Sequence, residues 1–285
     1  MIRRLVRGAW RRVRTQPLDG GASVASQGRP PEPPARATPP RPAAAGYRLT
    51  RPHLREWPDE AFDPVFLAAS RTGGLEALRA AVRKVHPDVY ALTPLAPARV
   101  RELSAEIGRF HAWCLATGAT PDAPNSMNTY GVTLDTLGID PTRLLEALAP
   151  FATQLFAPMG GDTLDHAHGF VVSYAHGRDV DLGFHADDAE VTLNLCLGEG
   201  FAGGALYFEG LRCEAHRQTG CSEADRFIWT HTPGVALLHA GAHRHGALPI
   251  LSGTRHNLIL WMRSAAWRGA AHVECPEWCR ESMAR

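Results

Sequence analysis

The sequence predicts an α+β fold in which a mainly helical N-terminal half precedes one β sandwich or barrel. Between residues 47 and 160, apolar residues recur mostly at helical spacing. From about residue 168 the pattern changes to short runs of β-branched and aromatic residues, separated by Gly, Asp and Pro. With 45% hydrophobic residues among 285, the chain is long enough to bury a sizeable core.

Residues 1–45 form an Arg/Pro-rich leader, which we expect to be disordered. Within residues 1–14, apolar side chains recur at helical spacing, and six arginines fill the other face. This pattern is typical of an organelle-targeting presequence or a membrane-surface helix. A disordered leader or a wrongly assigned start codon explains it equally well. Residues 16–45 contain eight prolines and predict a disordered linker.

Residues 46–160 predict a mainly helical region that supports the β core. The expected elements are a helix over Leu75–Val85, a strand over Val89–Leu92, and helices over Ala98–Leu115 and Thr142–Phe156. Pro97 lies near the start of the second helix. Asp140 is expected to cap the third helix, because its side chain can accept from the first free N–H groups, and Pro141 suits the first helical position.

Residues 161–265 predict the β core, and residues 266–285 predict a short polar tail. Short strands with turns every 8–12 residues indicate a sandwich or barrel. The expected strands are Gly169–Tyr174, Glu190–Leu197, Ala205–Phe208, Phe227–Thr230, Val235–His239 and Arg255–Arg263.

The net charge of +1 hides an uneven distribution of charge. Residues 1–45 hold nine of the 30 basic residues and two of the 29 acidic ones, so the remainder carries 21 and 27, a net charge of about −6. Such a core is a poor electrostatic partner for phosphodiester backbones, and we expect no nucleic-acid partner. The longest apolar runs reach only about ten residues, well short of a transmembrane helix.

The six cysteines are scattered and follow no secretory signal, which predicts a cytoplasmic protein without a disulfide framework. Organelle import is the alternative if residues 1–14 are a true presequence in a eukaryote. The spacings among Cys213, Cys221, Cys275 and Cys279 do not fit the usual C-x2-C zinc knuckles. We therefore predict no zinc site and assign no role to Cys275 or Cys279.

Eleven of the 14 histidines lie between His166 and His272. In the segment FHADD, His185 and Asp187 are two residues apart, so in extended backbone both side chains emerge on one face. Such a pair can present two ligands to one metal ion, whereas Asp188 would point away. A third ligand must come from elsewhere, and the downstream stretch offers four histidines: His239, His243, His245 and His256.

Arg255 lies ten residues after His245 and opens an apolar strand. On that strand it shares one face with Asn257, Ile259 and Trp261, while the neighbouring histidine faces the other side. An inward Arg is costly unless it is paired, and a bound carboxylate is a natural partner because guanidinium grips it bidentately. Two His, one Asp and an inward Arg describe a non-heme Fe(II) facial triad beside a dicarboxylate.

The spacing H-x-D, about 58 residues, then H-x9-R resembles the Fe(II)/2-oxoglutarate-dependent oxygenases of the prolyl 4-hydroxylase and lysyl hydroxylase type. More narrowly, several segments resemble the group of 2-oxoglutarate and iron-dependent oxygenase domain-containing protein 2. These segments are FVVSYAHGRDVDLGFHADDAEVTLNLCLG, GGALYF, HGALPILSGTRHNLILW and the upstream PNSMNTYGVTLDTLGID. The resemblance covers roughly residues 88–265.

The resemblance implies a double-stranded β-helix (jelly-roll) core with Fe(II) as the metal. It implies that His185, Asp187 and His245 bind the iron and that Arg255 pairs with the C5 carboxylate of 2-oxoglutarate. It also implies O₂ as cosubstrate, ascorbate as reductant, and hydroxylation of a protein side chain or small molecule, with 2-oxoglutarate decarboxylated to succinate.

Two further positions match residues that line the cosubstrate pocket in lysyl hydroxylases. Tyr174 lies eleven residues before His185, and Asn194 lies nine after it. The alternatives are a core aromatic for Tyr174 and a backbone-satisfied buried amide for Asn194. Thr192 shares the face of Asn194 and is a weaker candidate.

Two positions distinguish this sequence from members of the superfamily that catalyse other reactions. Halogenating members of the superfamily have Ala or Gly at the position of Asp187, so its presence disfavours halogenation. Trp261 replaces the second Arg expected of nucleic-acid dealkylating members. A catalytically silent jelly-roll binding or sensing module and a cupin-like metal enzyme that does not use 2-oxoglutarate remain as rivals.

Several neighbouring residues are given ordinary structural roles. His239 and His243 are expected to be surface or strand-end histidines. Asn128 and Tyr130 either face the substrate mouth or cap a turn. The Gly203–Gly204 pair predicts a bulge or turn. The loops over residues 121–131 and 209–226 would hold the selectivity, but their composition identifies neither the substrate nor the oligomeric state.

Overall fold

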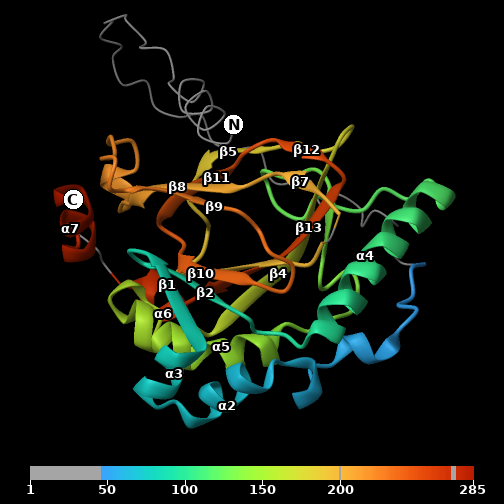
Figure 1. Ribbon diagram of the computed structural model, residues 1–285, viewed down its shortest axis with the longest axis horizontal. Coiled ribbons are helices and arrows are strands. Elements are labelled where there is room, and N and C mark those ends of the chain that lie inside the picture. Colours follow the sequence, from blue (N-terminus) through green and yellow to red (C-terminus); the bar gives the residue numbers. More distant parts are fainter. Residues whose placement is uncertain (1–45, 199, 271–273) are drawn as a thin grey trace, which may run out of the picture. The chain divides into compact units, whose positions relative to one another are not determined.

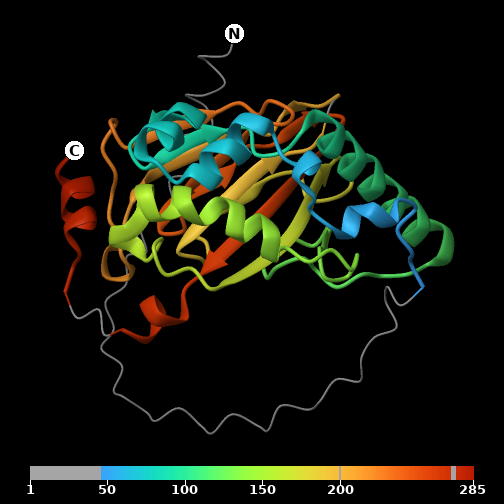
Figure 2. The ribbon, with the colours of Figure 1, turned by 90° about the horizontal axis from the view of Figure 1, so that it is seen from below.

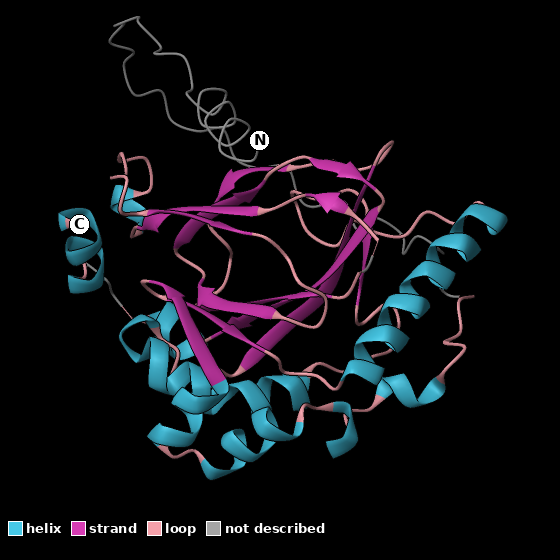
Figure 3. Ribbon diagram, in the orientation of Figure 1, coloured by secondary structure: helices cyan, strands magenta, loops and turns pink. Residues whose placement is uncertain are grey.

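The protein is described from a computed structural model that covers residues 46–198, 200–270 and 274–285. The predictions for the leader, residues 1–45, lie outside the described residues. Two antiparallel sheets face each other, and helices cover the outer side of the larger one (Figures 1 and 3). Among the helices of the described ranges, none is long and apolar enough to cross a membrane.

The larger sheet has seven strands in the order β1-β2-β10-β6-β13-β4-β3. Its strands are β1 (Val82–His86), β2 (Val89–Leu92), β3 (Gly131–Thr133), β4 (His166–Ala175), β6 (Val191–Cys196), β10 (Ala236–Ala240) and β13 (Thr254–Arg263). The last strand, β13, lies inside the sheet and pairs with β4 from Thr254↔Ala175 to Arg263↔His166, and with β6 on its other side.

The smaller sheet has four strands in the order β5-β11-β8-β9. These are β5 (Leu182–His185), β8 (Leu206–Leu211), β9 (Arg226–Trp229) and β11 (His243–Ala247), and a separate pair joins β7 (Ala202–Gly203) to β12 (Ile250–Ser252). After β4, the chain passes repeatedly between the facing sheets: β5 lies in the smaller one, β6 in the larger, the hairpin β8–β9 in the smaller, β10 in the larger, β11 in the smaller and β13 in the larger. This is the connectivity of a double-stranded β-helix. The predicted jelly-roll core is confirmed.

The main helices are α2 (Pro64–Thr72), α3 (Leu75–Ala81), α4 (Pro97–Thr117) and α5 (Thr142–Phe156). Figure 2 shows α2, α3 and α5 spread across the outer face of the larger sheet. Helix α5 buries Leu144, Leu148 and Phe151 at helical spacing, in the same cluster as Leu193 and Leu195 of β6. Burying each such side chain contributes roughly 1.5–3 kcal/mol, so this layer fixes the sheet.

Alternate residues of β6 point the other way, between the two sheets. Thr192 and Asn194 line an internal cavity there, whereas their neighbours Leu193 and Leu195 belong to the outer core. The larger sheet therefore separates the apolar core beneath the helices from the cavity between the two sheets.

The six strands predicted after residue 168 are confirmed within one to three residues at each end, and Val89–Leu92 and Thr142–Phe156 match the structure. Asp140 Oδ1 accepts a hydrogen bond from the Thr142 N–H at 2.9 Å, but the N-cap of this helix is Pro141 rather than Asp140, one residue later than predicted. The remaining predicted helix, Ala98–Leu115, extends to Thr117 as α4.

Two other predictions were wrong. The helix over Leu75–Val85 ends at Ala81, because residues 82–86 pair with β2 as β1. With β2 and β3, this strand brings part of the predicted helical region into the large sheet. The expected polar tail contains α6 (Ala265–Gly269) and α7 (Glu277–Ala284), and α7 buries Cys279 and Ser282 completely.

Four 3₁₀ turns, η1 (Pro52–Arg55), η2 (Asp59–Ala61), η3 (Ala157–Met159) and η4 (Glu214–His216), complete the described helices.

Candidate metal centre

Strand pairing in the smaller sheet brings two histidines together. His185 ends β5, and His245 lies in β11 directly opposite it in the antiparallel register. Asp187 follows β5 by two residues, and its N–H donates to the Gly241 carbonyl at 2.9 Å. Because Gly241 opens the two-residue turn between β10 and β11, this bond ties the Asp187 loop to the start of the strand that carries His245.

Ligand atoms of His185, Asp187 and His245 lie within 4.8 Å of one another. Nε2 of His185 is 3.4 Å from Asp187 Oδ1, and Nε2 of His245 is 3.8 Å from Asp187 Oδ2. The two imidazole ring centroids are 4.4 Å apart. The structure therefore brings together all three residues that the sequence grouped, whereas Asp188 points away and pairs with Arg263 and Arg268 at 2.8 Å.

The other ring nitrogens are held by backbone. Nδ1–H of His185 donates to the Gly183 carbonyl, and Nδ1–H of His245 donates to the His243 carbonyl, each at 2.8 Å. These bonds place a proton on Nδ1 of both rings and turn both Nε2 atoms toward Asp187. Two imidazoles and one carboxylate are a donor set that suits Fe(II), so the residues fit the metal that the resemblance implies.

The electrostatics of the cluster favour the metal-binding forms of Asp187 and His245, whereas at His185 the Asp187 carboxylate outweighs burial and raises the pKa. Burial alone would raise the pKa of Asp187, but the imidazoles of His245 and His185 more than offset it and hold the pKa well below its usual range. Burial lowers the pKa of His245 to about 3. Asp187 is therefore a carboxylate and His245 a neutral imidazole near pH 7.

Thr192 supports Asp187 from the larger sheet. Its hydroxyl donates to Asp187 Oδ2 at 2.7 Å and leaves Oδ1 free. We expect Thr192→Val to weaken metal binding by about 10–100-fold, because it removes an orienting bond at nearly constant volume. The check is anaerobic titration with Fe(II). Thr133→Val, which removes a hydroxyl bonded only to Thr136, is the control and should leave the affinity unchanged.

Arg255 lies across the cavity from the triad, on the larger sheet. Its side chain is 1% exposed, its guanidinium carbon lies 4.3 Å from the centroid of the Tyr174 ring, and Nη1 donates to the Gly204 carbonyl. Among the described residues, its Nε has no hydrogen-bond partner. The Tyr174 hydroxyl accepts from Asn128 Nδ2 at 3.1 Å. A buried guanidinium with an unused donor fits an anionic ligand, such as the distal carboxylate of 2-oxoglutarate.

Gly204 is required for this approach. Its φ is +66°, and a Cβ there would lie 2.7 Å from Arg255 Nη1. We expect Gly204→Ala to weaken 2-oxoglutarate binding by about 10-fold, because it strains the backbone and displaces Arg255. Equilibrium binding to the metal-loaded protein measures this. Gly200→Ala is the matched control, because φ is +75° there but no heavy atom lies within 4 Å of the added Cβ. Equal losses in both variants would contradict the role given to the Arg255 contact.

Asn194 lines the same cavity as Tyr174, the triad and Arg255. Its Oδ1 accepts from Asn257 Nδ2 at 2.5 Å, so a side chain rather than the backbone satisfies it. His231, which no sequence signal singled out, is also buried here, with Nδ1 3.4 Å from Asn257 Nδ2. Burial lowers the pKa of His231 well below its usual value, which keeps it neutral beside Arg255.

His239 and His243 were expected at the surface or at strand ends. The strand-end part is confirmed, because His239 is the last residue but one of β10 and His243 is the first residue of β11, whereas neither residue lies at the surface. Both are fully buried. The His239 ring centroid lies 4.9 Å from that of His245, and His239 Nδ1–H donates to the Ala240 carbonyl at 2.9 Å. Phe208 contacts both rings at centroid distances of 5.3 and 5.0 Å. His239 from the larger sheet and His243 from the smaller one thus pack with Phe208 beside His245 of the triad.

The other residues considered in the sequence are His256, Asn128, Tyr130 and the Gly203–Gly204 pair. His256 faces outward, where its Nδ1 lies 2.9 Å from Ser173 Oγ, as expected for the face opposite Arg255. Asn128 is buried at the cavity, whereas Tyr130 is 40% exposed and does not line it. The turn at Gly203–Gly204, with positive φ at both residues, is confirmed.

Comparison with known proteins adds independent findings. A family model described as the OGFOD2-like domain matches residues 44–161, a stretch that precedes the triad. The chain is 42% identical over 229 residues to the 2-oxoglutarate and iron-dependent oxygenase domain-containing protein CP2 of Arabidopsis thaliana. This match covers 79% of this chain and 58% of that protein. It is 36% identical over 250 residues to the 2-oxoglutarate and iron-dependent oxygenase domain-containing protein 2 of Homo sapiens. This match covers 84% of this chain and 68% of that protein.

The chain thus spans little more than half the length of the plant relatives that it matches. Among solved structures, it is similar to a prolyl-4-hydroxylase of Pseudomonas putida, with a TM-score of 0.43 and 16% identity over 70% of this chain and 98% of that chain.

Proposed function

Because the chain belongs to the family of 2-oxoglutarate and iron-dependent oxygenase domain-containing protein 2, we propose that it is an Fe(II)- and 2-oxoglutarate-dependent dioxygenase. Its reaction would be hydroxylation of a protein side chain or a small molecule, with ascorbate as the reductant that keeps the metal ferrous. The observation that carries the proposal is one cavity lined by the His185–Asp187–His245 triad and by Arg255.

The triad, Arg255, Tyr174 and the apolar side chains around them would each have a separate task in this reaction. The triad would hold Fe(II) on one side and leave its other positions for ligands. Bound iron and 2-oxoglutarate would supply the oxidation, in which O₂ and 2-oxoglutarate yield succinate and CO₂ while one oxygen atom enters a substrate C–H bond. Arg255 would hold the distal carboxylate, and Tyr174 would keep the guanidinium in place from its stacked position. The packed apolar side chains around them, Phe170, Ile259 and Trp261, exclude water.

Two loops supply the surfaces on which a substrate would be selected. From residues 121–131, Asn125, Met127 and Asn128 line the triad cavity. From residues 209–226, Arg212, Glu214 and Arg217 line a second cavity of about 570 Å³ that also contacts Asp187. Mixed charges and polar groups suit a polar substrate, and the proposed substrate classes remain a protein side chain or a small molecule.

The test is anaerobic binding of Fe(II) and 2-oxoglutarate by the full chain, measured by the weak metal-to-ligand charge-transfer band in the visible. We expect the wild type to give the band, His245→Ala to lose it together with the metal, and Arg255→Ala to lose it while still binding Fe(II). Succinate release then reports turnover in a substrate screen.

The two rivals make different predictions in the same experiment. A cupin-like metal enzyme would bind the metal without giving the band or releasing succinate. A silent binding module built on the complete triad would give the band but no succinate with any substrate. Metal binding without the band would therefore contradict the oxygenase proposal at the step of 2-oxoglutarate binding.

A further inference from the structure

A second cluster of metal-ligating side chains lies apart from the triad. Sγ of Cys213, Cys275 and Cys279 and a ring nitrogen of His216 all lie within 4.8 Å of one another. Sγ of Cys213 is 3.2 Å from His216 Nδ1 and 3.9 Å from Cys275 Sγ, and Cys279 Sγ is 3.8 Å from His216 Nδ1. Cys221, which the sequence grouped with these cysteines, is not a member, and the histidine stands in its place.

Local structure places the four side chains. Cys213 caps the 3₁₀ turn η4, and His216 ends it, so the two lie three residues apart on one side of the turn. Cys275 precedes Pro276, and Cys279 lies in the first turn of α7. The Cys213 N–H also donates to Cys279 Sγ at 3.2 Å, which joins the start of η4 to α7.

The separations fit a shared metal ion better than a disulfide. A disulfide needs about 2.05 Å between two sulfurs, whereas Cys213 and Cys275 are 3.9 Å apart, and all six cysteines are free. With bonds of about 2.3 Å to sulfur and about 2.0 Å to nitrogen, tetrahedral zinc holds its sulfurs about 3.8 Å apart and each sulfur about 3.5 Å from the nitrogen. The observed sulfur–sulfur distance of 3.9 Å and the sulfur–nitrogen distances of 3.2 and 3.8 Å lie close to these values.

The chemistry of the donors also separates this cluster from the triad. Three thiols and one imidazole select zinc, whereas the imidazole and carboxylate donors of the triad suit iron. Four protein ligands fill a tetrahedral shell and leave no position for a substrate, which is typical of a structural site. The cluster is partly to fully buried, with Cys279 completely enclosed.

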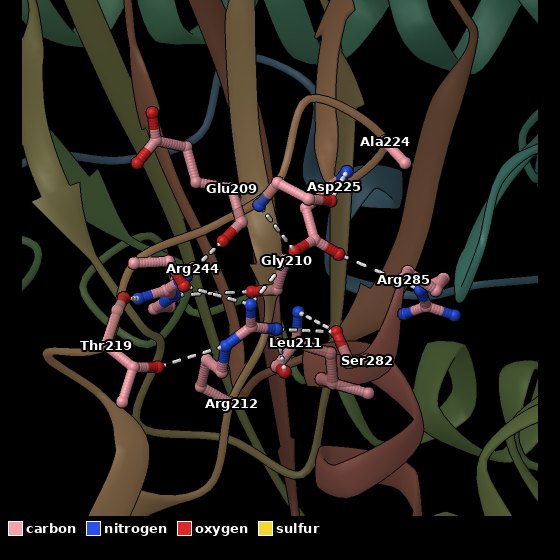
Figure 4. Close-up of polar contacts among 12 residues, drawn as sticks. Glu209, Gly210, Leu211, Arg212, Thr219, Ala224, Asp225, Arg244, Ser282 and Arg285 are labelled. Carbon is pink, nitrogen blue, oxygen red and sulfur yellow. Dashed lines mark hydrogen bonds and ion pairs between the residues drawn. The ribbon is translucent and has the colours of Figure 1, made fainter.

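A second set of contacts, near the C-terminal end of α7, also joins this helix to the β8–β9 connection. Figure 4 shows Arg212, from the end of β8, reaching Ser282 of α7, Thr219 and Asp225. Arg212 Nη1 donates to Ser282 Oγ at 2.7 Å, and Nη2 lies 2.9 Å from Asp225 Oδ2. Helix α7 is thereby fixed against the β8–β9 connection at one end, and the Cys/His cluster joins the same two segments at the other.

We propose that Cys213, His216, Cys275 and Cys279 bind a structural Zn²⁺ ion that fastens the C-terminal helix to the β8–β9 connection. Residues around the four ligands line the cavity of about 570 Å³ that also contacts Asp187. The ion therefore fixes one wall of the cavity beside the triad. This assignment does not depend on the oxygenase activity.

The test is the metal content of the full chain, purified without chelators and measured by inductively coupled plasma mass spectrometry. The Asp187→Ala background removes zinc held by the triad. We expect one zinc ion per chain in this background, loss of that ion in Cys275→Ser and in Cys279→Ser, and retention in the control Cys221→Ser. Zinc retained at full occupancy in Cys279→Ser would overturn the proposal.

Cobalt substitution provides a readout that needs no cysteine variant. Co²⁺ in the proposed site should give thiolate-to-cobalt charge-transfer absorption, which the triad cannot give because it has no sulfur ligand. Absence of this absorption in the Co²⁺-loaded wild type would contradict the proposal, even if the serine variants fail to fold. A Cys213–Cys275 disulfide found by mass spectrometry of the freshly purified chain would contradict it as well.

Discussion

Asp187→Ala is expected to abolish Fe(II) binding by the triad and, with it, all succinate production. The carboxylate is buried between two imidazoles and supplies the only negative charge among the three ligands. Loss of a bond that merely orients a ligand costs about 10–100-fold in metal affinity, and loss of the ligand itself should cost more than about 100-fold. Anaerobic Fe(II) titration measures the affinity, and thermal unfolding shows whether the variant remains folded.

Asp188→Asn is the matched control, since it removes one negative charge from the adjacent residue. Asp188 is exposed and pairs with Arg263 and Arg268 instead of facing the triad. We expect its Fe(II) affinity to stay within about twofold of wild type, because exposed ion pairs contribute little. Similar losses in the two variants would mean that general electrostatics, rather than ligation by Asp187, controls metal binding.

Asp225→Ala is expected to lower the free energy of unfolding by about 3–5 kcal/mol. The Asp225 carboxylate and the Arg212 guanidinium are 2.9 Å apart, and their side chains are only 1% and 2% exposed. Truncation leaves the guanidinium buried without its countercharge, although its bonds to Ser282, Thr219 and backbone carbonyls remain. Urea unfolding followed by circular dichroism gives the difference.

Glu214→Ala is the control for this experiment, because it breaks an exposed ion pair in the same connection. Arg217 Nη2 lies 2.5 Å from Glu214 Oε2, and the two side chains are 47% and 80% exposed. Exposed pairs contribute roughly 0–1 kcal/mol, so its stability should be close to that of wild type. A loss below about 1 kcal/mol in Asp225→Ala would show that the other partners of Arg212 compensate for the missing carboxylate.

The sequence predicted strands well where β-branched and apolar residues alternate, as in β6 and β13. It failed for β5 and β11, whose sequences LGFH and HRHGA contain glycine and histidine and have weak β-propensity. Strand β11 forms because it pairs with β8 on one side, and β5 forms because it pairs with β11 on the other. Tertiary context thus builds the part of the small sheet that carries the two histidines of the triad.

Two of the three ligands could be grouped from the residues alone, because a two-residue spacing places His185 and Asp187 on one side of an extended segment. The third, His245, was one of four downstream histidines, and the family resemblance selected it. The burial of His239 and His243 could not be predicted, since histidine is usually only partly buried and no local pattern marks these two positions. The Cys/His cluster was missed for a related reason. Its ligands come from two segments about 60 residues apart, and only the folded chain brings them together.

The position of β13 inside the large sheet has a consequence for how the chain folds. Its neighbours β4 and β6 are made much earlier, and during synthesis about 67 residues separate the end of β6 from the end of β13. At 5–20 residues per second, this interval lasts roughly 3–13 s. Throughout it, β4 and β6 each expose an unpaired edge to other chains. The strand that carries Arg255 therefore also ends the period in which the nascent protein is most open to aggregation.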